Sequence, residues 1–294
     1  MMYLFADDNK VFKVIRHPTR DRDDMQIDLD KLYSWSKVWL MRIHPDKLFG
    51  MEIGGWRENP QHDYTVGPML VKHSKMEKDI GVEVDDQLRF SSHIDTITKK
   101  ANSKAGWLRR SFRFMTPILF RPLYIAIVRS QLEYAAPVWS PYRQHDIDKL
   151  ESVQVRATKM LPGFKTKTYE ERLIALNLPT LRYRRLRGDM IMVYKILSGK
   201  HKRSLCPNLM TKAETTGRRG RNSMALHQHR CRTDIRKYCF SYRVVSVWNT
   251  LPEEVVSSKT VDQFKRRIDH AWRKEKMKFD YKEGLSMLRP TRRK

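Results

Sequence analysis

The chain has 294 residues, 40% of them hydrophobic, and a net charge of +26. This hydrophobic content, with seven tryptophans, excludes a disordered polybasic tail, and the length suffices for about two domains. No apolar run reaches the roughly 20 residues of a membrane span, and Asp7 and Asp8 interrupt the first apolar stretch too early for a signal peptide. Three cysteines leave an odd thiol, which favours a reducing compartment. We therefore expect an intracellular protein, cytoplasmic or nuclear, with no membrane partner and no secretion.

The excess positive charge lies in the second part of the chain. Residues 1–100 hold 16 Lys and Arg against 17 Asp and Glu, whereas residues 101–294 hold 43 against 16. This concentration of cations is typical of a surface that binds nucleic-acid phosphates, with an affinity that falls as salt rises. The alternative is a solvated basic surface that serves solubility. The size of the imbalance favours an anionic partner, because like charges on one surface repel each other.

The N-terminal residues predict a β-hairpin with an acidic turn. Residues 2–5 and 11–15 are apolar stretches that suit two strands, and Asp7 and Asp8 lie between them. Carboxylate oxygens are ligands that Mg²⁺ prefers. The turn is therefore a candidate magnesium site, and the alternative is a solvated acidic turn.

The rest of the first 90 residues predicts one helix and short strands. Residues 23–41 are expected to form an amphipathic helix that covers the hairpin. Its apolar positions recur at spacings of three and four: Leu29, Leu32, Trp35, Val38 and Trp39. Residues 48–53, 64–70 and 80–84 predict strands that are separated by Gly and Pro turns.

From residue 91 onward the pattern changes to helices. Ser92, with Asp95 three residues later, predicts a capping box, and apolar residues recur helically from Ile94 to Phe112. The other positions hold six cations: Lys99, Lys100, Lys104, Arg109, Arg110 and Arg113. One face of this helix is therefore expected to pack on a neighbour while the other meets a nucleic-acid backbone, unless the cations are simply solvated.

More helices are predicted farther along, so the fold class is α+β. One begins at Thr116 and Pro117, and others cover residues 145–160 and 181–197. The last of these begins with a cluster of candidate nucleic-acid-binding residues: Arg182, Arg184, Arg185 and Arg187. At about 100° per residue these four cannot share one face, so some are expected to pair with acids and others to meet phosphate.

Residues 215–221 form a basic stretch without periodicity, which predicts a linker that orders on nucleic acid. Its candidate phosphate-binding residues are Arg218, Arg219 and Arg221.

Two sets of residues near the C-terminal end are each compatible with two roles. His227, His229, Cys231 and Cys239 are metal-ligand types, but their spacing does not match the paired C-x2-4-C pattern, so zinc is disfavoured against buried or incidental thiols. Four aromatic residues could stack unpaired bases, although core packing is favoured. They are Tyr238, Phe240, Tyr242 and Trp248.

Six segments resemble, in family order, the reverse transcriptase of a LINE-type (non-LTR) retrotransposon. They are FADD at residues 5–8, WLMRIHPDK at 39–47, EKDIGVEVDDQLRFSSHI at 77–94, LEYAAPVWSPY at 132–142, LPTLRYRRLRGDMIMVYKILSG at 178–199 and CRTDIRKYCFSYRVVSVWNTLPEEVV at 231–256. The resemblance implies an RNA-directed DNA polymerase whose partners are RNA, RNA–DNA hybrid or DNA.

The resemblance also implies roles for single residues. Asp7 and Asp8 correspond to the catalytic Mg²⁺ ligands, and Lys47 to a lysine beside the departing pyrophosphate, unless it belongs to an ordinary turn. A hairpin on which the primer end rests, the primer grip, corresponds to Lys78, Asp79 and Gly81. A strand glycine can instead mark a bulge.

The implied architecture is the C-terminal part of such a polymerase. Residues 1–90 would be a residual palm, 91–204 a helical thumb-like domain, 205–222 a basic linker and 223–294 a basic extension. The family's first catalytic aspartate and its fingers are missing, so we expect a truncated polymerase that is inactive alone, with its upstream half as a further candidate partner. The alternatives are a non-catalytic nucleic-acid-binding module and a helical protein-interaction scaffold.

Overall fold

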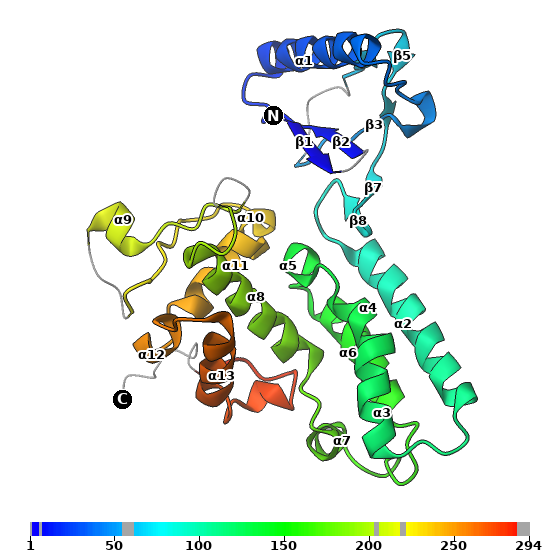
Figure 1. Ribbon diagram of the computed structural model, residues 1–294, viewed down its shortest axis with the longest axis vertical. Helices are drawn as coiled ribbons and strands as arrows, with labels where there is room; N and C mark the ends of the chain where they lie inside the picture. The colour runs from blue at the N-terminus through cyan, green and yellow to red at the C-terminus, as the bar shows by residue number, and fades with distance from the viewer. Residues whose placement is uncertain (1, 6–7, 55–61, 203–205, 218–221, 287–294) are drawn as a thin grey trace. The chain divides into compact units, whose positions relative to one another are not determined.

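The computed structural model describes residues 2–5, 8–54, 62–202, 206–217 and 222–286. The chain divides into two compact units, Met1–Leu88 and Arg89–Lys294 (Figure 1). Short strands are found in the first unit and most helices in the second, so the fold class is α+β, as predicted. None of the described helices combines the length and the hydropathy that a membrane crossing requires.

The strands of the first unit form small two-stranded sheets. Their bounds are β1 Met2–Phe5, β2 Asp8–Val11, β3 Phe49–Gly50, β4 Thr65–Val66, β5 Met69–Leu70, β6 Lys72–His73, β7 Met76–Asp79 and β8 Val82–Asp85. The pairs β1–β2, β4–β5 and β7–β8 are antiparallel, and β3–β6 is parallel. The predicted second strand of the first hairpin, residues 11–15, is corrected to Asp8–Val11, because the register places Asp8 opposite Phe5.

Helix α1, Pro18–Val38, begins earlier than predicted. Pro18 suits the first helical position, and the backbone N–H groups of Arg16 and His17 donate to Asp21 Oδ2 at 2.6 and 2.7 Å. The backbone hydrogen bond from His17, followed by the one from Arg16, lowers the pKa of Asp21. Asp21 thus stabilises the N-terminal turn of α1, and the apolar periodicity did not indicate this role.

The apolar face of α1 differs from the predicted one. Leu29 is buried against Val66 and Val71, whereas Trp35 and Trp39 are 43% and 66% exposed. The described core of this unit therefore joins α1 to the region of β4. Two hydrogen bonds of 3.0 Å between the Gln26 amide and the backbone of Thr65 fix this contact. At Gly67, φ is +60° and a Cβ would lie 2.3 Å from the Tyr33 ring, so only glycine fits there.

The second unit is helical. Its helices are α2 Ser91–Ser111, α3 Pro117–Leu123, the π-helix Tyr124–Arg129, α4 Ser130–Glu133, α5 Ala136–Trp139, α6 Gln144–Thr158, α7 Tyr169–Leu176, α8 Leu181–Leu197, α9 Lys212–Thr216, α10 Asp234–Tyr238, α11 Phe240–Trp248, α12 Glu253–Val256 and α13 Val261–Ala271. The predicted helices at residues 145–160 and 181–197 correspond to α6 and α8. Helix α3 starts at Pro117 as predicted, and Thr116 Oγ1 accepts from the N–H of Leu119 at 3.3 Å.

Helix α8 joins the two halves of this unit. It contacts α5 and α6 on one side and α11 and α13 on the other. One apolar core, from Tyr183 to Leu285, contains the fully buried Trp248, Phe264 and Trp272. The segments predicted as a separate thumb-like domain and a separate extension therefore pack together in one unit.

Two local predictions are also corrected. Helix α2 begins at Ser91 after Phe90, so Ser92 lies in its first turn rather than at its N-cap, and Asp95 forms an ion pair with Lys149. The predicted linker contains α9, whose capping box joins Thr211 and Glu214.

Candidate nucleic-acid interface

Helix α2 presents a buried apolar stripe to the rest of the second unit. Ile94, Ala101 and Leu108 are at most 1% exposed, and this side contacts α6, the π-helix and α4. Their spacing of seven residues keeps them on one side of the helix. Packing therefore fixes which face of α2 points outward.

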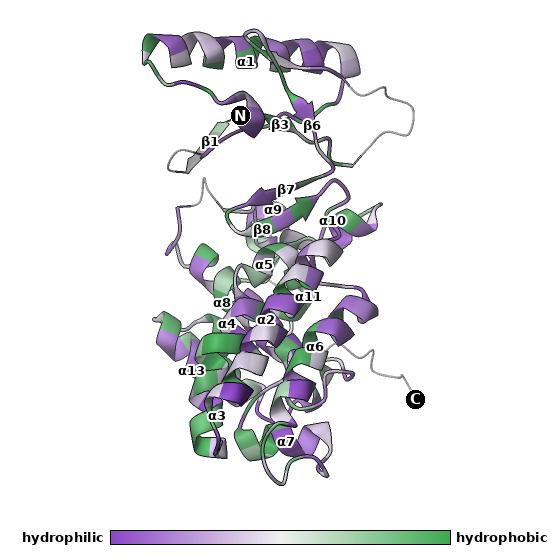
Figure 2. Cartoon of the chain, turned by 90° about the vertical axis from the view of Figure 1, so that its right-hand side faces the viewer, coloured by the Kyte–Doolittle hydropathy of each residue, from purple (hydrophilic) through white to green (hydrophobic). Residues whose placement is uncertain are grey.

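The six predicted cations, which we call the α2 basic face, comprise five residues of α2 and Arg113, which lies just beyond its last residue, Ser111. All six are exposed: Lys99, Lys100, Lys104, Arg109, Arg110 and Arg113. Across the described ranges no acidic side chain forms an ion pair with any of them. The one acidic residue of α2, Asp95, is paired with Lys149. Figure 2, which views α2 from the side away from α8, shows hydrophilic residues along it. The α2 basic face is thus an array of uncompensated positive charge.

Trp107 adds an aromatic group that the sequence reasoning did not single out. It is 51% exposed, although most tryptophan surface is normally buried. Lys100, Lys104 and Trp107 follow one another at spacings of four and three, so they line one side of the helix. This spacing, at positions outside the apolar stripe, is the sequence signal that could have indicated Trp107. A half-exposed indole among cations can stack on a base while the cations contact phosphates.

A cavity of about 220 Å³ lies at the C-terminal end of α2. Arg109 and Arg113 contribute to its wall, and Leu108, Phe112 and Phe120 make it apolar. Nearby Phe114 is 79% exposed, and the Arg113 guanidinium lies 5.6 Å from the centre of its ring. Cations and apolar groups are therefore mixed at this end of the α2 basic face.

The arginines of α8 have different surroundings. Arg184 forms two hydrogen bonds with Glu133, at 2.7 and 2.8 Å, and Arg187 forms two with Asp269, at 2.5 and 2.7 Å. Arg182 donates to the carbonyl oxygen of Tyr281 at 2.8 Å. Arg185 is only 5% exposed. Three of these side chains thus bond to neighbouring segments and Arg185 is buried, so the candidate interface is built on α2 rather than on α8.

The predicted catalytic residues lie in the first unit. Asp7 is outside the described residues, and Asp8 is exposed at the start of β2. Lys47 is exposed at the end of the short 3-10 helix Pro45–Lys47. Its neighbour Asp46 accepts from Lys72 Nζ at 2.7 Å, and this hydrogen bond lowers the pKa of Asp46. In the described part of the chain, no hydrogen bond or ion pair joins Asp8 to Lys47.

The primer-grip-like segment is a β-hairpin. Strands β7 and β8 pair around Ile80 and Gly81, which both have positive φ, 43° and 82°. Gly81 therefore lies in a two-residue hairpin turn rather than in a bulge. Lys78 is exposed, and Asp79 forms an ion pair with Lys10 of β2. This ion pair connects the hairpin with Asp8 to the hairpin with Gly81.

Over the described ranges, no group of three or more His, Cys, Asp or Glu side chains is placed to hold a metal ion. Asp7, one of the two predicted magnesium ligands, lies outside these ranges. The rings of His227 and His229 lie edge to face with their centres 4.5 Å apart. The Cys231 thiol donates a hydrogen bond to the carbonyl oxygen of His229, and the Cys239 thiol donates one to that of Arg236.

The remaining candidates for nucleic-acid contact divide into two groups. Arg218, Arg219 and Arg221 lie outside the described residues. Of the four aromatic residues, Trp248 is fully buried and Tyr238 stacks on Tyr142 with ring centres 4.1 Å apart. Core packing, the favoured reading, is confirmed for Trp248.

Sequence comparison finds relatives among mobile-element polymerases. An uncharacterised protein of Caenorhabditis elegans is 28% identical over 137 residues, which are 46% of this chain and 69% of that protein. Two proteins of Drosophila melanogaster are each 22% identical over 166 residues. They are the RNA-directed DNA polymerase of the mobile element jockey and the probable RNA-directed DNA polymerase of the transposon X-element. Part of this chain is related to reverse transcriptases.

The reverse-transcriptase-related region is a part of each protein. The aligned residues are 55% of this chain and 18% of each Drosophila polymerase, so the chain spans less than a fifth of these two relatives. No protein-family model matches the chain, and no solved structure matches it.

Proposed function

We propose that this chain is the C-terminal part of a non-LTR retrotransposon reverse transcriptase, and that its α2 basic face binds the backbone of template RNA or of the RNA–DNA hybrid. The observation that carries the binding proposal is that six cations on and just after one helix of a packed unit are exposed and form no ion pair within the described part of the chain. The relationship to two mobile-element polymerases supports the choice of nucleic acid as the partner.

The chemistry of the α2 basic face suits backbone binding rather than sequence reading. Lysine and arginine contacts with phosphate fix the position of a duplex but carry no sequence information. Each neutralised phosphate releases condensed counterions, so affinity depends steeply on salt. Trp107 would add stacking on an exposed base, which any base allows. The expected binding is therefore strong at low salt and nearly independent of sequence.

Substitution of two lysines tests this proposal. The double variant Lys100→Gln/Lys104→Gln should bind an RNA–DNA hybrid more weakly and should lower the slope of log affinity against log salt by about 0.9 for each lost phosphate contact. The matched control is Lys259→Gln/Lys274→Gln, which removes two exposed lysines near the ends of α13. Equal losses in both double variants would show that total charge, and not the α2 basic face, determines binding.

The proposal assigns catalytic roles in the first unit to residues that match the polymerase motif. Asp7 and Asp8 would hold Mg²⁺, Lys47 would act near pyrophosphate, and Lys78, Asp79 and Gly81 would support the primer end. Magnesium ions in such a site stabilise the attacking and the leaving oxygens of a phosphoryl displacement. The ion pair of Lys10 with Asp79 supports this assignment, since it keeps the two hairpins together.

We further propose that the 294-residue polypeptide alone does not polymerise DNA, because the resemblance to reverse transcriptases implies a further catalytic aspartate upstream of Asp7 and Asp8. It spans less than a fifth of each related polymerase. Template-directed incorporation of dNTPs should therefore equal that of an Asp7→Asn variant. Incorporation above this variant would show that the polypeptide carries a complete catalytic site.

A non-catalytic nucleic-acid-binding module is the second candidate. The observation in its favour is that the α2 basic face belongs to a compact unit, Arg89–Lys294, with its own apolar core. Asp7→Asn would then change neither hybrid binding nor any cellular role. A role that is lost in Asp7→Asn would exclude this candidate.

A further inference from the structure

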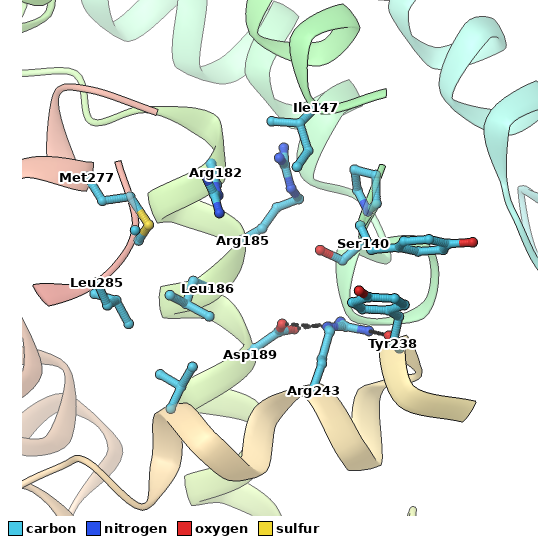
Figure 3. A pocket seen from close by; sticks show the side chains of 14 residues that line it. Ser140, Ile147, Arg182, Arg185, Leu186, Asp189, Tyr238, Arg243, Met277 and Leu285 are labelled. Atoms are coloured by element: carbon cyan, nitrogen blue, oxygen red, sulfur yellow. Dashed lines mark hydrogen bonds and ion pairs between the residues drawn. The ribbon is translucent and has the colours of Figure 1, made fainter. Parts of the chain in front are cut away.

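A cavity of about 500 Å³ lies beside α8 in the second unit (Figure 3). Its walls come from α8, from residues 140–142, from α10 and α11, and from residues 284 and 285. No residue of the α2 basic face lines it. Its size falls in the range of small-molecule sites. The cavity is therefore a second candidate site, separate from the proposed hybrid interface.

Arg185 supplies a buried hydrogen-bond donor without an acceptor. Its side chain lines the cavity and is only 5% exposed, and among the described residues Nη1 has no hydrogen-bond partner. The nearby carboxylates, Glu151 and Asp189, accept hydrogen bonds from other donors and none from Arg185 Nη1. Glu151 accepts from Tyr169 Oη and from the N–H of Arg182, both at 2.8 Å, and Asp189 accepts from Arg243 at 3.0 and 3.1 Å. A buried donor without a partner is unfavourable, so it points to a missing ligand.

The rest of the cavity has a cationic part and an aromatic part. Arg182 brings a second guanidinium to the wall. The rings of Tyr142 and Tyr238 stack with their centres 4.1 Å apart, and the angle between their planes is 2°. Figure 3 shows Arg185 extending toward Ile147, with Tyr238 and the Asp189–Arg243 pair on one side and the apolar Leu186 and Leu285 on the other.

We propose that this cavity binds a small phosphate ester that carries a planar ring, in the size class of a nucleoside monophosphate. The phosphate oxygens would accept from Arg185 and Arg182, because the guanidinium fork matches phosphate geometry. The planar ring would pack between the tyrosine pair and the apolar wall. Burial lowers the pKa of Arg185 to about 10, so the group is still charged at neutral pH.

The test is calorimetric titration of the full chain with adenosine monophosphate, adenosine and inorganic phosphate in 0.2 M salt, where loose surface binding is screened. Adenosine monophosphate should bind at least tenfold more tightly than either of the others, since it uses both parts of the cavity. Equal affinity for all three compounds, or no binding of adenosine monophosphate, would overturn the proposal.

Two glycine variants locate the binding. Gly284 lines the cavity and Gly188 does not, and a Cβ at either position meets no heavy atom within 4 Å. Gly284→Phe should lower the affinity for adenosine monophosphate at least tenfold by filling the cavity, whereas Gly188→Phe should change it less than twofold. Unchanged affinity in Gly284→Phe would refute the assignment.

A third variant tests the guanidinium itself. Arg185→Lys keeps the charge but removes the fork, and it should weaken binding at least tenfold. If this variant does not fold, the Gly284→Phe variant still tests the proposal, because it fills the cavity and leaves Arg185 in place.

The Lys100→Gln/Lys104→Gln variant should retain the affinity for adenosine monophosphate, so failure of this site and failure of the hybrid interface are distinguishable. Loss of that affinity in the lysine variant would contradict a separate site.

Discussion

Replacement of Trp248 by alanine is expected to lower the free energy of unfolding of the second unit by about 3–5 kcal/mol. The side chain is 0% exposed, its ring stacks on Phe264 with centres 5.9 Å apart, and Nε1 donates to the carbonyl oxygen of Met224 at 2.9 Å. Alanine would leave a large cavity and an unpaired carbonyl in the core that joins α8, α11 and α13.

Urea unfolding followed by circular dichroism measures this loss, and Trp107→Ala is the matched control. Trp107 is 51% exposed, so its replacement should change the free energy of unfolding by about 1 kcal/mol or less while it weakens hybrid binding. If Trp248→Ala melts only the segment after residue 222 and leaves α2 and α6 folded, the second unit is not one cooperative core.

The second large effect is expected at the buried ion pair of α8 and α11. Asp189 is 2% exposed and accepts from Arg243 at 3.0 and 3.1 Å, and Arg243 also donates to the carbonyl oxygen of Pro137 at 2.8 Å. Arg243→Met should cost about 3–5 kcal/mol at neutral pH, because it leaves a buried carboxylate without its counter-charge. The double variant Asp189→Leu/Arg243→Met should be clearly more stable than Arg243→Met.

The loss in Arg243→Met should depend on pH. Burial raises the pKa of Asp189 above 3.8, and Arg243 opposes this rise. Without Arg243 the folded-state pKa rises further, so the folded state of the variant binds its proton more tightly than the unfolded chain does. The deficit should therefore be small near pH 4 and grow as pH rises through the folded-state pKa. Chemical denaturation at pH 4 and pH 7 measures it, and a deficit independent of pH would exclude an unpaired carboxylate as the cause.

Regular helices could be predicted well from the sequence. The apolar spacing of α2 and the bounds of α8 follow from local periodicity, which depends only on residues within a few turns. The inner face of α1 could not be predicted, because Trp35 and Trp39 fit the same periodicity as Leu29. Which of these residues is buried depends on contacts of α1 with Thr65 and Gly67, far away in the sequence.

The candidate site could be predicted only in part, because local periodicity indicates which residues of a helix are exposed but not which distant residues they contact. The cations of α2 occupy positions outside its apolar stripe, so their exposure follows from helix geometry. The α8 arginines look equally suited to phosphate in the sequence, but Glu133 and Asp269, which engage Arg184 and Arg187, are 51 and 82 residues distant. The cavity at Arg185 is formed by α8 together with residues 140–147, 238–247 and 277–285, so no local pattern could indicate it.

The most direct test of the proposed hybrid interface is the salt dependence of binding. The full chain should be titrated with an RNA–DNA hybrid at 50 mM and at 200 mM salt. If the six cations of the α2 basic face contact phosphates, affinity should fall on the order of 10³-fold between these conditions. Equal affinity at both salt concentrations would contradict phosphate binding by this face.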